Sequence, residues 1–193
     1  MGWKIPFRKI VVLMWMSILV VCLTHSCWAV ESDAWKTLET QFTKIQYLSQ
    51  DDLKHFHDSL NFGPGKWSAK RIIESQGSSG LESSLKNKVD AMYERVQDIL
   101  DMRPKMAAVR IRVLPDKKYL TREYESIYKA RCNVRSWYLY EANTIYINSQ
   151  DIHEGILAHE MGHAISDHFL VIRPPRVSAE VWSMYVEAHL FDD

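Results

Sequence analysis

The chain has few cysteines, no excess of one charge sign and no long hydrophobic run. Only three of its 193 residues are cysteine, and two of these, Cys22 and Cys27, lie in a segment that we expect to be removed. Cys132 then has no disulfide partner, and a single cysteine of this kind is most often a small buried apolar residue. The 24 basic residues equal the 24 acidic ones, so the charge balance does not indicate a nucleic-acid partner.

The longest apolar run lies close to the N-terminus and is typical of an export signal. Residues 4–9 carry three basic side chains, residues 10–23 are largely apolar, and residues 27–29 form an approximate cleavage site. The run is shorter than the roughly 20 residues that cross a bilayer. We therefore predict that residues 1–29 are a signal peptide of an exported protein, periplasmic or secreted. The alternative is membrane association through a retained anchor at residues 10–23.

The most specific pattern is His-Glu-x-x-His at His159, Glu160 and His163. It lies in the proline-free segment 152–169, whose apolar residues recur at helical spacing. On a helix, residues four apart share a face, so both imidazoles can bind one metal ion, with Glu160 placed to take a proton from an activated water. The pattern predicts a Zn2+ site with hydrolase chemistry. Gly162, inside the pattern, would allow another backbone to approach the helix closely.

A catalytic zinc site needs a third protein ligand. A second helical segment, from Val177 to Leu190, follows a short proline-containing turn, and Ser178 could cap its first turn. Two antiparallel helices with a short connection bring the start of the second beside the end of the first. This geometry favours Glu180 as the third ligand. Glu187 is the alternative ligand, or an acid that orients an imidazole, and Asp167 is a weaker candidate for either role.

The motif and the downstream helical glutamate resemble the gluzincin metallopeptidases, of which thermolysin is the familiar example. The resemblance extends from about Asn133 to the end of the chain. It implies that His159, His163 and Glu180 hold zinc and that Glu160 is the general base.

The same resemblance implies an edge strand before the motif helix that pairs with an extended peptide. Residues 135–138, followed by a partner strand at 143–147, fit that description. Gluzincins of this type often carry a second acid four residues after the third ligand, where this chain has Met184.

Peptide hydrolysis also needs a donor for the developing oxyanion. We predict Tyr185 in this catalytic role, with His168, Arg173 and His189 as alternatives. The predicted function is that of an exported zinc metallopeptidase acting on a peptide or protein substrate. The alternative is a non-catalytic zincin-fold protein that serves in binding or assembly in the cell envelope.

Hydrophobic periodicity predicts an α+β fold, a minimal zincin-like domain. In it a small antiparallel sheet packs on the motif helix, and a C-terminal helix closes the domain. We expect a helical N-terminal part at 30–103 that forms one compact unit with a core at 104–193. The expected elements are helices at 32–48, at 51–60 with Ser49 as cap and from a capping box at 79–82 to Pro104, a strand at 109–113, a helix at 120–128 and a hairpin at 134–148.

Overall fold

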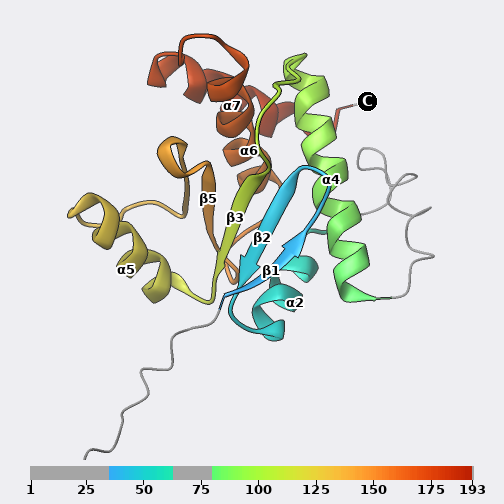
Figure 1. Cartoon of the computed structure of the whole chain (residues 1–193), viewed down its shortest axis with the longest axis vertical. Coiled ribbons are helices and arrows are strands. Elements are labelled where there is room, and N and C mark those ends of the chain that lie inside the picture. Colours follow the sequence, from blue (N-terminus) through green and yellow to red (C-terminus); the bar gives the residue numbers. More distant parts are fainter. Residues whose placement is uncertain (1–34, 63–79, 193) are drawn as a thin grey trace, which may run out of the picture. The chain divides into compact units, whose positions relative to one another are not determined.

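The computed structural model describes residues 35–62 and 80–192 (Figure 1). The predicted signal peptide, residues 1–29, lies outside the described residues. Residues Trp35–Asp193 form one compact unit. Among the described residues, no helix is both long and apolar enough to cross a lipid bilayer.

A five-stranded mixed sheet forms the centre of this unit. Its strands lie in the order β1-β2-β3-β5-β4. The inner pairs β2–β3 and β3–β5 are parallel, whereas β1–β2 and β4–β5 are antiparallel. The expected combination of helices with a sheet is confirmed, but the prediction of a small antiparallel sheet was wrong. The strands are β1 (Lys36–Glu39), β2 (Thr43–Tyr47), β3 (Val109–Leu114), β4 (Ser136–Leu139) and β5 (Thr144–Asn148).

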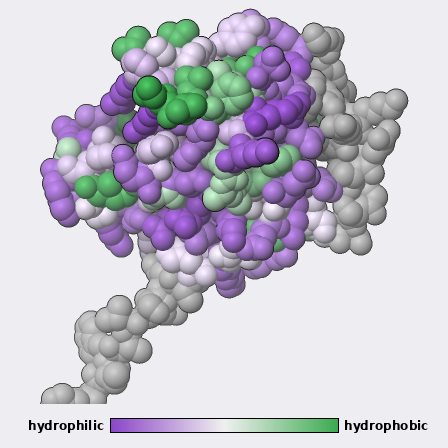
Figure 2. All heavy atoms as spheres, turned by 45° about the horizontal axis from the view of Figure 1, so that its top comes forward, coloured by the Kyte–Doolittle hydropathy of each residue, from purple (hydrophilic) through white to green (hydrophobic). Residues whose placement is uncertain are grey.

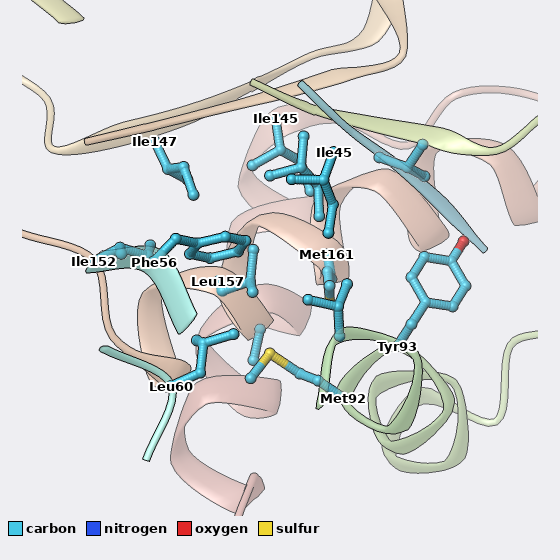
Figure 3. Packing of buried hydrophobic residues seen from close by; sticks show 14 of the residues in the cluster. Ile45, Phe56, Leu60, Met92, Tyr93, Ile145, Ile147, Ile152, Leu157 and Met161 are labelled. Atoms are coloured by element: carbon cyan, nitrogen blue, oxygen red, sulfur yellow. The ribbon is translucent and has the colours of Figure 1, made fainter. Parts of the chain in front are cut away.

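Residues that pair across the strands give the sheet one strongly apolar face. Ile45, Ile111 and Ile145 are direct partners on β2, β3 and β5, and all three are fully buried. Figure 3 shows Ile45 and Ile145 above Phe56, Leu157 and Met161 from the helices below. Because successive side chains of a strand alternate between faces, the neighbouring positions project to the other side.

That other face carries a smaller cluster. Arg112, Tyr146 and Trp137 follow one another across β3, β5 and β4. The rings of Trp137 and Tyr146 stack at 4.4 Å between centroids, and the Arg112 guanidinium lies 5.9 Å from the Tyr146 ring. The helix α5 (Lys117–Tyr128) covers this face, and its Leu120 is fully buried there.

The remaining helices pack on the apolar face or on one another. They are α2 (Gln50–Ser59), α4 (Leu81–Leu100), α6 (Glu154–Phe169) and α7 (Arg176–His189), and the short 3-10 helix η1 (Tyr140–Ala142) follows β4. Their apolar side chains form one continuous core with the sheet. The described residues before 104 therefore contribute β1, β2, α2 and α4 to the same core as the motif helix α6.

The helix predicted at residues 32–48 was wrong, because β1 and β2 form a hairpin there. Thr43, Ile45 and Tyr47 are buried and alternate with more exposed residues, which is the period of a strand. Asp90 of α4 fixes the turn, since its Oδ1 accepts a hydrogen bond of 2.6 Å from Thr40 Oγ1. Threonine and aromatic residues also favour strands.

The other predicted elements are present, with two corrections at helix starts. Ser49 caps α2 and forms a capping box with Asp52, as expected. In contrast, Gly80 rather than a capping serine precedes α4, and Pro175 rather than Ser178 occupies the cap of α7. The isolated Cys132 is buried, as predicted.

Candidate metal centre

Helices α6 and α7 pack closely because α6 has a glycine at the contact. A Cβ atom added to Gly162 would lie 3.0 Å from Ser183 Oγ and 3.2 Å from Ser183 Cα. Gly162 therefore allows α7 to approach, as the sequence suggested. Glu180 and Glu187 lie about one helical turn to either side of Ser183, so both acids face α6.

The close packing brings three predicted ligands together. Glu180 Oε2 lies 3.5 Å from His159 Nε2 and 3.5 Å from His163 Nε2. One nitrogen or oxygen of each of the three residues lies within 4.8 Å of those of the other two. Within the described part of the chain, this is the group of histidines and acids whose geometry suits a metal ion.

The donor set suits zinc in chemistry, and so does the spacing of Glu180 from each histidine. Zinc bonds of about 2.0–2.1 Å in tetrahedral geometry place neighbouring ligand atoms about 3.3 Å apart, close to the 3.5 Å between Glu180 Oε2 and each histidine nitrogen. Burial, and next the nearby His159, lower the pKa of His163 well below its usual value. His163 is therefore neutral near pH 7, which is the form that binds metals.

Glu187 lies behind His159 rather than among the three ligand atoms. Its Oε2 is 3.4 Å from His159 Nδ1. That nitrogen is buried and has no hydrogen bond to any described residue, so the carboxylate is close but not aligned with the N–H. A carboxylate in this position can fix the orientation of a ligating imidazole.

The carboxyl group of Glu160 is buried on the side of α6 that faces the sheet edge. Ser136 Oγ of β4 donates a hydrogen bond of 2.6 Å to Glu160 Oε1. Burial raises the pKa of Glu160 to about 7, against the opposing effect of that hydrogen bond. Such a carboxyl can both accept and release a proton near neutral pH.

A cleft of about 720 Å³ opens over these groups. It runs along β4 and η1, over the face of α6 that carries the histidines, to the α6–α7 turn and the start of α7. Since β4 ends the order of strands, one side of this strand has no neighbouring strand in the described sheet. Its lining includes His159, Glu160, His163, Glu180, Asp167, Arg173, Arg176 and five aromatic residues, Tyr124, Tyr128, Trp137, Tyr138 and Tyr140.

The predicted oxyanion donors separate into two groups. Tyr185 and His189 stack on each other, with 4.0 Å between ring centroids, and neither is among the residues that line the cleft. The structure therefore does not place Tyr185 at the site. Arg173 does line the cleft, and His168 lies beside it, with Nε2 2.8 Å from the hydroxyl of Tyr138.

Sequence reasoning placed Ser136 in the predicted edge strand without foreseeing its contact with Glu160, and it did not single out Tyr140. Both belong to the edge strand and the turn after it, far from the motif in sequence. The signal that could have indicated Ser136 is the alternation of β4, which turns Ser136 and Tyr138 toward α6 and Trp137 toward the opposite face. No family model, no curated protein and no solved structure matches the chain.

Proposed function

We propose that the protein is an exported zinc-dependent metallopeptidase. One observation carries the proposal: ligand atoms of His159, His163 and Glu180 converge on a single point, and the buried carboxyl group of Glu160 is next to them in the same cleft. A structural zinc ion is fully enclosed by its protein ligands and binds no water. A site that only stabilised the fold would therefore have no use for a proton acceptor such as Glu160.

When bound, zinc would polarise the scissile carbonyl and the attacking water. Glu160 takes the proton of that water and later delivers it to the leaving amine. Ser136 holds the Glu160 carboxyl through its 2.6 Å hydrogen bond, so the carboxylate is already oriented when the substrate enters. Glu187 restrains the imidazole of His159 from behind.

Arg176 takes the place of Tyr185 as the proposed oxyanion donor. It lines the cleft, and its Nε lies 3.7 Å from Glu180 Oε1. The Arg176 side chain is 90% exposed, so a bound substrate would have to order this cation before it could stabilise negative charge on the scissile carbonyl.

The substrate in this proposal is an extended peptide that adds to the free side of β4. Strand addition supplies main-chain hydrogen bonds along the peptide, and side-chain pockets supply selectivity. The aromatic side chains along the cleft would pack against the residues on either side of the scissile bond.

The test compares the protein with its Glu160→Gln variant in zinc-loaded form. Glutamine has nearly the same shape but cannot accept the proton, so we expect at least a hundredfold loss of casein or peptide cleavage. Zinc content should be unchanged, since Glu160 is not among the ligand atoms. The measurement is fluorescent casein hydrolysis beside zinc determined by elemental analysis. Equal cleavage by the variant, or no cleavage by the zinc-loaded parent, would contradict the proposal.

A second candidate function is binding or assembly in the cell envelope without turnover. The observation that favours it is an apolar surface on the α6–α7 turn and the outer side of α7, visible where green residues gather in Figure 2. Val171 is fully exposed and Ile172 is 82% exposed, and three further side chains of α7, Val177, Val181 and Met184, are also exposed. Exposed apolar surface of this extent is typical of interaction sites. This function predicts that the parent and Glu160→Gln both bind zinc and that neither cleaves casein or peptides.

A further inference from the structure

Arg173, in the α6–α7 turn, is held as a fixed cation in the wall of the cleft. Its Nε and Nη2 each lie 2.9 Å from Asp167 Oδ2. The Asp167 side chain is 4% exposed, whereas that of Arg173 is 48% exposed. The guanidinium also lies 4.4 Å from the centre of the Tyr140 ring. A buried acid and an aromatic ring thus orient one edge of the guanidinium and leave the rest open to the cleft.

The aromatic ring under Arg173 is itself supported. Tyr140 stacks on His168 with 4.9 Å between ring centroids, and His168 is bonded to the hydroxyl of Tyr138. These contacts join the end of β4 to the end of α6. Arg173 consequently has a rigid base, and a ligand that it binds would meet a cation already in position.

The position of the cation relative to the metal centre follows from the helix. Asp167 lies four residues after His163, one turn or about 6 Å along α6. Arg173, bound to Asp167, is therefore about one substrate residue or two away from the metal ligands. Both Arg173 and the three ligands line the same cleft.

A neighbouring acid marks where a ligand would bind. Glu141 Oε1 lies 3.8 Å from Arg173 Nη1, which is too long for a hydrogen bond. The Glu141 side chain is 71% exposed, so the pair contributes little and a carboxylate from outside can displace it. A guanidinium can bind a second carboxylate through its remaining N–H groups.

The direction of the edge strand indicates which side of the scissile bond Arg173 would contact. Near its start, β4 contacts Glu160 of α6 through Ser136. Further along the strand, Tyr138 contacts His168, which lies about two helical turns after Glu160 on α6. The strand therefore leads from the metal centre toward Arg173. A peptide that adds antiparallel, the more stable arrangement, has its amino-terminal residues at that end.

We propose that Arg173 binds the carboxylate of an acidic side chain on the amino-terminal side of the scissile bond. The inference rests on the proposed function, because the metal centre of that function fixes where the cleaved bond lies relative to Arg173. Binding by Arg173 would make the enzyme selective for peptides with Asp or Glu one or two residues before the cleaved bond. Arg173 is a specificity-determining residue in this account and takes no part in bond breaking.

The experiment uses blocked peptides, acetylated and amidated, that differ only by Glu or Gln at one position. One blocked series varies the amino-terminal side of the cleaved bond, and a second varies the carboxyl-terminal side. A separate control series carries Gln at both positions and has a free C-terminal carboxylate in place of the amide. We expect kcat/KM to favour Glu over Gln about tenfold in the first series alone. Arg173→Gln should bring this ratio close to unity, and Arg173→Lys should give an intermediate ratio because lysine lacks the planar fork.

Glu141→Gln provides a variant that leaves the Asp167–Arg173 pair intact. Removing the competing acid should raise the Glu-to-Gln ratio above that of the parent. This variant keeps the proposal falsifiable if Arg173→Gln fails to fold once Asp167 is left buried and unpaired. The proposal would be overturned by a Glu-to-Gln ratio of kcat/KM near unity in the parent. It would also be overturned if this ratio is unchanged in both Glu141→Gln and Arg173→Lys, or if the preference for a carboxylate is confined to the second series or to the control series.

A binding arm separates this inference from the proposed function. The same peptides are titrated by calorimetry into zinc-loaded Glu160→Gln protein, in which no turnover is needed. Tighter binding of the Glu peptide, with no cleavage by the parent, would reject the peptidase and retain the carboxylate site. If the parent cleaves peptides but the Glu and Gln peptides bind with equal affinity, the carboxylate site alone is rejected. If no peptide binds, the carboxylate site is also rejected.

Discussion

At the scale of single residues, the hydrogen bond between Ser136 and Glu160 joins the edge strand to the motif helix. The Glu160 carboxyl is buried, and a buried carboxylate needs a partner to hold one orientation. Ser136 Oγ is one such partner at 2.6 Å, and the backbone of Tyr138 supplies a second hydrogen bond. The hydroxyl therefore helps to set where the proton of the attacking water can be transferred.

We predict that Ser136→Ala lowers kcat about tenfold while zinc binding stays at the parental level. The loss follows because the carboxylate keeps its chemistry and the backbone hydrogen bond of Tyr138, but loses the side-chain hydrogen bond that helps to fix its direction. Peptide kinetics together with zinc titration would measure both quantities. Ser126→Ala is the matched control, because Ser126 is exposed on α5 and its hydroxyl donates to the local backbone oxygen of Glu123. A kcat equal to that of this control would show that Ser136 does not position Glu160.

Sequence reasoning could predict the residues whose geometry is local. The spacing of His159 and His163 fixes a shared helix face, and a short turn brings Glu180 near them, so these residues could be proposed without a structure. The contacts of Ser136, Tyr140 and Arg173 could not be predicted in this way, since they depend on how β4 and η1 pack against α6. Tyr185 was predicted as oxyanion donor from its helix alone, and the packing of that helix turns it away from the cleft.

At the scale of elements, the distance between α6 and α7 determines the metal site. Gly162 and Ser183 form a close contact between the two helices. Glu180 lies one turn before that contact and approaches His159 and His163. A small separation of the helices would move the third ligand away from both histidines.

Gly162→Ala should therefore weaken zinc binding by about tenfold or more. The added methyl group would lie 3.0–3.2 Å from Ser183, and part of this contact is with the backbone, so α7 must shift. Competition with a zinc-sensitive dye would give the change in affinity. Ser183→Ala is the control, because it removes a buried hydroxyl that has no hydrogen bond to any described residue and adds no bulk. Equal zinc affinity in Gly162→Ala and the parent would contradict this role for the glycine.

The hairpin β1–β2 shows why some elements could not be predicted. Leu38, Phe42 and Ile45 have the spacing of a helix face, and this spacing alone predicts a helix. In the structure, strand pairing with β3 and the acceptor Asp90 on α4 outweigh it. Both partners lie more than 40 residues away, so local periodicity alone could not reveal them.

At the scale of the whole molecule, the chain from Trp35 onward works as one unit. β2 supplies Ile45 to the core face, α2 supplies Phe56, and Leu60 follows directly after α2. The helix α4 packs on the motif helix (Figure 3). The N-terminal part is thus structural support for α6 and is continuous with the core that carries the site. The sequence predicted that the two parts form one unit, but it did not predict the parallel strands that join them.

The central claim is that His159, His163 and Glu180 hold one zinc ion while Glu187 only orients His159. The measurement that tests it most directly is zinc content per chain, by elemental analysis after zinc loading and desalting, for the parent, Glu180→Gln and Glu187→Gln. We predict about one zinc ion in the parent, nearly none in Glu180→Gln, and most of the parental content in Glu187→Gln, because an orienting acid affects affinity less than a ligand does. An empty parent protein, or zinc lost from Glu187→Gln and kept by Glu180→Gln, would contradict the account.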